Sequence, residues 1–318
     1  MQFSLKKNWQ ILKTAGGGFI DDKVPKLSAS LAYYMVFSMG PLLLIIITMC
    51  SYFFGRDAVE GRVYTELQGF TGKDTAAQLQ QIIRSASLSG KTMLASIIGG
   101  IVLLIGATSV FAEMQDSINM IWSVKAKPKK GWLKMLQNRF LSFSVIISLA
   151  FLLLVSLAIS AVLEAFSEYL TNRFPSVTVT IFYILNLLIS IAITCFIFAI
   201  IFKVLPDAKI KWRHVIAGSM FTTVLFLLGK FGISFYISKN NIGTTYGPAG
   251  SLVVLILWVY YSAIILYFGA EFTKAYAIGH GSAIYPNDYA VTVQQVEVEK
   301  GQKPIQQKAS TTKVEGQG

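Results

Sequence analysis

The residue that points most directly to chemistry is Lys230, because it lies inside a long apolar stretch. A charge at the centre of a membrane helix costs about 2.5–3.5 kcal/mol on insertion scales. Lys230 stands eight residues before Ser238, or about 12 Å from the outer end of its stretch at 1.5 Å per helical residue. A lysine stem bridges only part of that depth by snorkelling. The position predicts either a cation facing an anion in a cavity, or a structural lysine bonded to neighbouring carbonyl groups.

Small polar residues share a predicted helix face with this lysine. They follow one another at spacings of 4, 7, 4 and 4 residues: Ser219, Thr223, Lys230, Ser234, Ser238. Such spacings bring side chains to one side of a helix, and a polar stripe should face protein or water rather than acyl chains. Asn186 and Glu164, in the two preceding apolar stretches, have a comparable depth and are candidate partners of Lys230.

A second group of charged residues gathers at the ends of apolar stretches that we assign to the cytoplasmic side. Its members are Glu113, Asp116, Glu271, Arg139, Lys203 and Arg213. Glu113 and Asp116 are three residues apart and share a helix face. The group predicts either a gate or coupling site built from ion pairs, or salt bridges that fix the order of the helices. The second interpretation is the simpler one.

Pro41 is the only proline within an apolar stretch, and Gly40 precedes it. A proline frees a backbone carbonyl inside a helix, so we expect a kink that either shapes a cavity or fits the packing.

Motifs for catalysis or metal binding are missing from the sequence. The two histidines, His214 and His280, are far apart, and Cys50 and Cys195 both lie in apolar stretches. No zinc motif, nucleophile elbow or paired-carboxylate nuclease motif is present. We therefore expect no enzyme activity, no metal and no cofactor.

Apolar stretches must position all of these residues. Hydrophobic residues make up 54% of the 318 residues and charged residues 14%, whereas a soluble domain has about 25% charged residues. About 20 apolar residues cross the hydrocarbon core of a bilayer. The predicted fold is therefore all-α, a polytopic membrane protein with six transmembrane helices. The predicted spans are residues 29–54, 93–110, 140–163, 178–204, 215–238 and 251–270.

Three segments outside the spans complete the predicted organisation. Residues 1–28 are a basic N-terminal segment, residues 29–279 form the membrane domain, and residues 280–318 form a tail expected to be disordered. The second span is expected to continue as a helix to Trp122. Between the first two spans, Thr75-Ala76-Ala77-Gln78 reads as a capping box before an amphipathic helix that carries Ala76, Leu79, Ile83 and Ala86.

Lysine and arginine counts predict the orientation. The N-terminal segment holds five, the loop after the second span six, and the loop after the fourth span four, while the loops after the third and fifth spans hold one each. The positive-inside rule places the basic loops and both termini in the cytoplasm, and the long loop of residues 55–91 on the other side. The basic loops are thus explained by topology, and no nucleic-acid partner is expected.

Three ordered motifs resemble the YihY/BrkB family. They are Leu31-Ala32-Tyr33-Tyr34 with Ser38-Met39-Gly40-Pro41; Ser117-Ile118-Asn119-Met120-Ile121-Trp122; and Tyr246-Gly247-Pro248-Ala249-Gly250 with Leu257-Trp258-Val259-Tyr260-Tyr261-Ser262 and Gly269-Ala270-Glu271. The resemblance covers about residues 20–280 and implies a multi-pass protein of the bacterial inner membrane. Some members of that family carry a ribonuclease BN label and others a virulence label, so the resemblance supports a topology more than a reaction.

Three functional hypotheses remain. The first is a transporter-like protein that handles an anionic lipid or envelope precursor, with membrane lipids as partners. The second is a non-catalytic membrane scaffold or envelope-integrity factor. The third is a membrane-bound ribonuclease, against which the missing metal cluster argues. The small-residue pairs Ser96/Gly100 and Ala95/Gly99 permit close helix approach, either within the chain or in a homo-oligomer.

Overall fold

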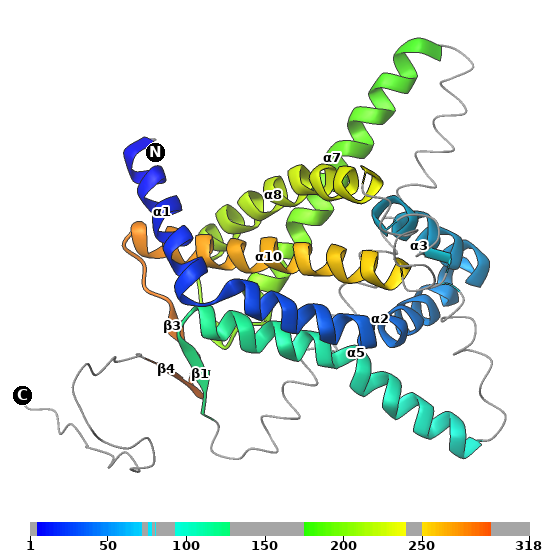
Figure 1. Ribbon diagram of the computed structural model, residues 1–318, viewed down its shortest axis with the longest axis horizontal. Helices are drawn as coiled ribbons and strands as arrows, with labels where there is room; N and C mark the ends of the chain where they lie inside the picture. Colours follow the sequence, from blue (N-terminus) through cyan, green and yellow to red (C-terminus); the bar gives the residue numbers. More distant parts are fainter. Residues whose placement is uncertain are drawn as a thin grey trace, which may run out of the picture.

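The computed structural model describes residues 5–71, 76–77, 80, 93–127, 175–239 and 250–293. Long helices dominate these residues (Figure 1). The helices are α1 (Leu5–Asp21), α2 (Val24–Phe54), α3 (Arg56–Thr71), α5 (Met93–Ile121), α7 (Pro175–Val204), α8 (Trp212–Lys239) and α10 (Gly250–Gly279). The strands are β1 (Val124–Ala126), β2 (Ala208–Lys209), β3 (Tyr285–Pro286) and β4 (Ala290–Thr292).

Helix α10 is central to the bundle. It packs against α8, α2 and α1, while α5 packs mainly on α2 and also contacts α10, and α7 packs on α8. Close approach of α8 and α10 depends on glycine. A Cβ atom at Gly218 would overlap the side chain of Thr273, and one at Gly269 would overlap the side chain of Thr222. Small residues of this kind let helix backbones come together where apolar burial against lipid gives no driving force.

Helix α2 bends where its sequence contains proline. Its two halves, Val24–Gly40 and Leu42–Phe53, meet at 44°, which confirms the kink expected at Pro41 and follows from the missing backbone donor. A second proline, Pro25, lies in the first turn of α2, where helices tolerate it because the first N–H groups have no intrahelical partner.

Segments that could cross a membrane, judged by length and composition, occur in part of the described chain. Among the described residues, three helices contain segments long and apolar enough to cross a membrane: Leu187–Val204 in α7, Trp212–Ile233 in α8 and Leu252–Gly279 in α10. The bent α2 is a fourth if its halves form one span. The predicted second span falls in α5, which ends at Ile121 close to the expected Trp122. The predicted third span, residues 140–163, lies outside the described residues, so six spans are not confirmed.

The C-terminal part of the described chain corrects one prediction. The tail expected to be disordered from residue 280 begins with ordered structure, because β3 pairs with β2 and β4 pairs with β1, both antiparallel. These strands are two or three residues long and gain their hydrogen bonds only from the loops after α5 and α7, so no local pattern announces them. They also add small β elements to the predicted all-α fold. We call the end of the helix bundle that carries β1, β2, β3 and β4 the strand end.

Two further helices differ from the sequence prediction. The N-terminal segment forms α1, whose Ile11 and Ala15 are buried against Ala275 of α10. In the loop after α2, the described helix is α3, and it starts directly after Gly55. The helix predicted over residues 76–86 is described only at residues 76, 77 and 80, which are helical. Helix α3 lies at the opposite end of the bundle from the strands (Figure 1).

Candidate functional site

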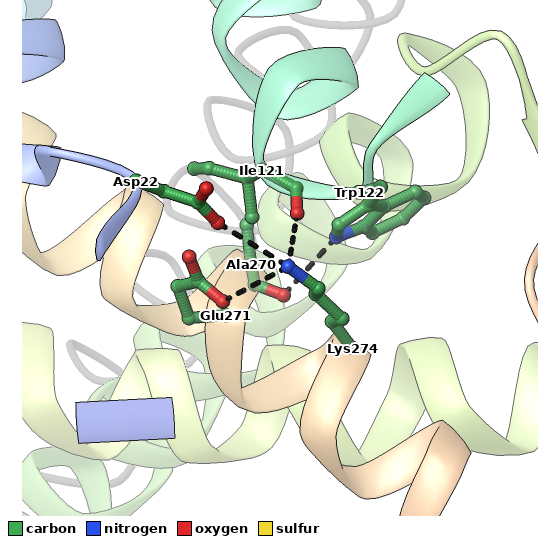
Figure 2. A network of polar contacts seen from close by, with 6 residues as sticks. All are labelled: Asp22, Ile121, Trp122, Ala270, Glu271 and Lys274. Atoms are coloured by element: carbon green, nitrogen blue, oxygen red, sulfur yellow. Dashed lines mark hydrogen bonds and ion pairs between the residues drawn. The ribbon is translucent and has the colours of Figure 1, made fainter. Parts of the chain in front are cut away.

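A lysine joins three chain segments at the strand end. The Nζ atom of Lys274, on the last turns of α10, donates to the carbonyl oxygen of Ile121 at 2.5 Å and to Oδ2 of Asp22 at 3.2 Å (Figure 2). Ile121 is the last residue of α5, so its carbonyl has no intrahelical partner and carries the negative end of the helix dipole. Lys274 therefore ties the end of α5 and the turn between α1 and α2 to α10.

Glu271 lies one turn before this lysine and is almost completely buried, with 2% of its surface exposed. Its Oε2 atom is 3.8 Å from Nζ of Lys274. The carboxyl group packs directly on the backbone of α1 at Gly18, where a Cβ atom would lie 2.5 Å from Oε2. No hydrogen-bond partner of its Oε1 atom occurs among the described residues. The Glu271 side chain therefore fits between α1 and α10 because Gly18 has no Cβ atom.

A second polar centre surrounds Asp207, which is buried in the loop between α7 and β2. Its carboxylate accepts hydrogen bonds from Gln115 Nε2 at 3.1 Å, Asn119 Nδ2 at 2.9 Å and the Tyr289 hydroxyl at 2.9 Å. In return, Asp207 N donates to Oδ1 of Asn119 at 2.8 Å. Because Tyr289 lies between β3 and β4, this centre fastens the C-terminal strands to α5.

An open cavity of about 870 Å³ adjoins both centres. Its lining includes Asp22, Asp116, Asn119 and Lys125. Strands β1 and β4 form another part of the wall through Val124, Ala126, Thr292 and Val293.

The six predicted cluster residues have different surroundings. Lys203 donates to the carbonyl oxygen of Ile210 at 2.6 Å and lies over the ring of Trp212. Asp116 is exposed in the cavity wall, Arg213 is exposed, and Glu113 is half-buried. Arg139 lies outside the described residues. Of the six, Glu271 is the one found at the centre of a polar network.

The partners of Glu271 were not identified from the sequence. Lys274 stands three residues after it on the same helix, a spacing typical of an ion pair, and this signal could have found it. Asp22 could not have been found in this way, because it is 249 positions from Glu271.

The predicted polar stripe on α8 is partly described. Thr223 is buried and donates to the carbonyl oxygen of Ser219 at 2.8 Å. The Ser219 hydroxyl lies 3.4 Å from Sγ of Cys195 on α7, so this part of the stripe faces a neighbouring helix. Lys230 is half-buried. The side chains of Ser234, Asn186 and Pro41 lie outside the described part of the structure, as does residue Glu164.

An apolar groove of about 730 Å³ runs between α1, α8 and α10. Each helix contributes to its wall. The lining consists of Gly16, Phe19 and Ile20 from α1; Leu225, Leu228 and Gly229 from α8; and Tyr261, Ile264, Ile265 and Phe268 from α10. Lys230 directly follows the last α8 residue of the lining.

Two motifs from the sequence meet at the strand end. The first motif is Gly269-Ala270-Glu271. The side chain of Thr222 on α8 packs against Gly269, and Glu271 packs on Gly18. The carbonyl oxygen of Ala270 accepts a hydrogen bond from Trp122 Nε1 at 3.1 Å. In the motif that ends α5, Asn119 binds Asp207, the Ile121 carbonyl binds Lys274, and Trp122 binds Ala270. Both motifs thus position the junction of α1, α5, α8 and α10.

Comparison with known proteins supports the resemblance. A UPF0761 membrane protein of Stenotrophomonas maltophilia is 29% identical over 266 residues, which cover 81% of this chain and 59% of that protein. A UPF0761 membrane protein of Legionella pneumophila is 27% identical over 82% of this chain and 60% of its own length. The chain spans about three fifths of the length of these relatives, and no solved structure matches it. The family described as virulence factor BrkB matches residues 15–286, and the chain belongs to this family.

Proposed function

We propose that this membrane protein handles an anionic amphiphile, a lipid or an envelope precursor, by binding a hydrocarbon chain in the groove between α1, α8 and α10. The groove is the observation that carries the proposal. Its walls on α8 and α10 fall within the segments that are long and apolar enough to cross a membrane. A groove at that depth opens towards acyl chains, which are the ligands that its apolar lining suits.

Charge favours an anionic head group. The chain has a formal net charge of +12, and Lys230 directly follows Gly229, the last α8 residue of the groove lining, in the sequence. A cation at membrane depth is retained in proteins mainly where it serves a ligand, an ion path or a partner group. An anionic head group near Lys230, with its chain along α8 and α10, is consistent with a transporter-like protein.

The proposed orientation places the strand end in the cytoplasm. The lysines and arginines of the N-terminal segment and of the loops after α5 and α7 are the basis, through the positive-inside rule. We propose the bacterial inner membrane as the location. The relatives are named as membrane proteins, and their names state no reaction.

Two neighbouring glycines of α1 provide a test. A Cβ atom at Gly16 or at Gly17 meets no other atom within 4 Å, and only Gly16 lines the groove. Gly16→Leu should fill the groove, whereas Gly17→Leu adds the same side chain to the same helix outside it. Both proteins are placed in nanodiscs that contain phosphatidylglycerol with a photoreactive acyl chain.

The expected result is cross-linking of the lipid to peptides of α8 and α10 in the unaltered protein and in Gly17→Leu, with a several-fold loss in Gly16→Leu. Equal labelling of both variants would mean that the groove holds no specific chain. The scaffold hypothesis would then be the better one. Replacing phosphatidylglycerol with a zwitterionic probe tests the head-group preference separately.

A further inference from the structure

We propose that a cavity at the start of α8 binds a phosphate group, and that this phosphate belongs to an anionic lipid at the membrane surface. The cavity has a volume of about 320 Å³ and shares no lining residue with the groove between α1, α8 and α10. Its lining comes from residues 209–211, directly before α8, and from residues 281–283 and Tyr285, which follow α10. The site does not depend on the proposed function.

The charged side chains of this lining are two lysines. Lys211 is exposed, and its side chain has no ion pair among the described residues. Lys209 lies 2.6 Å from Oδ1 of Asp288, in a pair that is largely open to solvent. None of the described lining residues is acidic. Two ammonium groups without a carboxylate in the wall favour an anion, and lysine is a common ligand of phosphate.

The charges next to the lining are also positive in sum. Residues 203–213 and 280–288 together carry four lysine or arginine residues and two aspartates. Lys203 donates to the carbonyl oxygen of Ile210 in the lining, and Arg213 is exposed on the first turn of α8. Asp207 offers little compensation, because its carboxylate already accepts the three hydrogen bonds of the second polar centre. The positive end of the α8 dipole directly follows Lys211 and adds to the attraction.

A buried histidine positions a neutral donor in the same cavity. His214 is 1% exposed, its Nε2 atom is 3.0 Å from the hydroxyl oxygen of Ser282, and its Nδ1 atom has no partner among the described residues. A buried N–H without an acceptor is rarer than a buried acceptor without a donor. We therefore assign the ring hydrogen to Nε2, which donates to Ser282. The hydroxyl hydrogen of Ser282, in the lining, is then available to an anion.

The position of the cavity indicates a lipid as the source of the phosphate. All three segments that could cross a membrane end beside it: one ends at Val204, one begins at Trp212, and one ends at Gly279. Trp212 and Tyr285 are exposed next to the lysines, and such aromatic side chains are enriched at the level of lipid head groups. The cavity therefore lies where the phosphate groups of a bilayer lie.

Amine labelling of the full chain in detergent micelles tests whether the cavity is occupied. A short-chain phosphatidic acid should slow the modification of Lys211 several-fold. Lys127, which is exposed after β1 and lies outside this cavity, reports general changes in reactivity. A short-chain diacylglycerol, which has no phosphate, should leave Lys211 unprotected. Equal labelling of Lys211 with and without phosphatidic acid would overturn the proposal.

Two matched variants separate the cavity from the basic surface around it. Lys211→Gln and Arg213→Gln each remove one exposed positive charge, but only Lys211 lines the cavity. Native mass spectrometry of retained phosphatidic acid should show about tenfold weaker binding in Lys211→Gln, the loss typical of one charge-assisted hydrogen bond, and little change in Arg213→Gln. Equal losses in both variants would mean that a diffuse basic surface attracts the lipid, and the cavity would be rejected.

Two further variants test the individual contacts. Ser282→Ala removes the hydroxyl donor and should weaken the binding of phosphatidic acid several-fold. Asp288→Asn removes the acid that competes for Lys209 and should strengthen it. Unchanged binding in both variants would overturn the contacts assigned to Ser282 and Lys209.

Inorganic phosphate distinguishes the two possible sources of the ligand. Phosphatidic acid should protect Lys211 at concentrations well below those that inorganic phosphate requires, because burial of the acyl chains adds to the binding. Equal protection by the two at the same concentration would assign the cavity to a soluble phosphate compound and overturn the lipid part of the proposal. Loss of lipid labelling in the Gly16→Leu experiment affects none of these results.

Discussion

A single glycine determines how closely α1 and α10 approach. At Gly18 a Cβ atom would lie 2.5 Å from Oε2 of Glu271 and 2.8 Å from its Cδ. Gly18→Ala should destabilise the protein by about 1–3 kcal/mol, the usual cost of overpacking. Gly17→Ala, in open space next to it, should stabilise α1 by about 0.5–1 kcal/mol because alanine favours a helix. Thermal unfolding in detergent measures both. If Gly18→Ala were as stable as Gly17→Ala, the Glu271 contact would contribute nothing.

The role of Lys230 is also decided at the level of one residue. Lys230→Met keeps most of the stem volume and removes the charge, while Lys230→Arg keeps the charge. If Lys230 attracts an anionic head group, the Met variant should accumulate normally and lose its preference for phosphatidylglycerol over phosphatidylcholine in cross-linking. The Arg variant should retain part of it. An unchanged preference in Lys230→Met would make Lys230 a structural lysine, and the proposed function would then rest on the groove alone.

At the level of elements, Asp207 holds the C-terminal strands in place. Asp207→Ala removes the acceptor of Gln115, Asn119 and Tyr289 together. The donors of Gln115 and Asn119 are buried, and a buried donor left unsatisfied costs about 1–3 kcal/mol. We expect faster proteolysis and faster hydrogen exchange of residues 285–293. Asp288→Ala is the control, because its ion pair with Lys209 is exposed and such pairs contribute about 0–1 kcal/mol. Similar protection of β3 and β4 in both variants would rule out this role.

At the level of the whole molecule, the charge distribution predicts one topology. A single cysteine in place of Ser87, in the loop of residues 55–91, should react with an impermeant thiol reagent from the outside of the cell. A cysteine in place of exposed Lys127, after β1, should react only once the membrane is opened. The reverse pattern would invert the proposed orientation, and with it the cytoplasmic position of Glu271 and Asp207.

Local sequence was sufficient for the long apolar helices and for the kink. Runs of about 20 apolar residues predict α2, α5, α7, α8 and α10, since each helix satisfies its own backbone hydrogen bonds without help from distant residues. Pro41 predicts the bend because its effect acts on the preceding turn. The motifs that indicated the family are likewise short and continuous.

Only the tertiary structure decided which polar groups meet. Asp22 reaches Lys274 across 252 positions, and Tyr289 reaches Asp207 across 82. The pairing of β1 with β4 depends on two loops that no local pattern connects. Such contacts are set by how helices pack, through glycines such as Gly18 and Gly269 that admit a side chain from another helix. The sequence placed Glu271 among the candidate residues, whereas its burial and its neighbours Gly18 and Asp22 depend on this packing and emerged only from the structure.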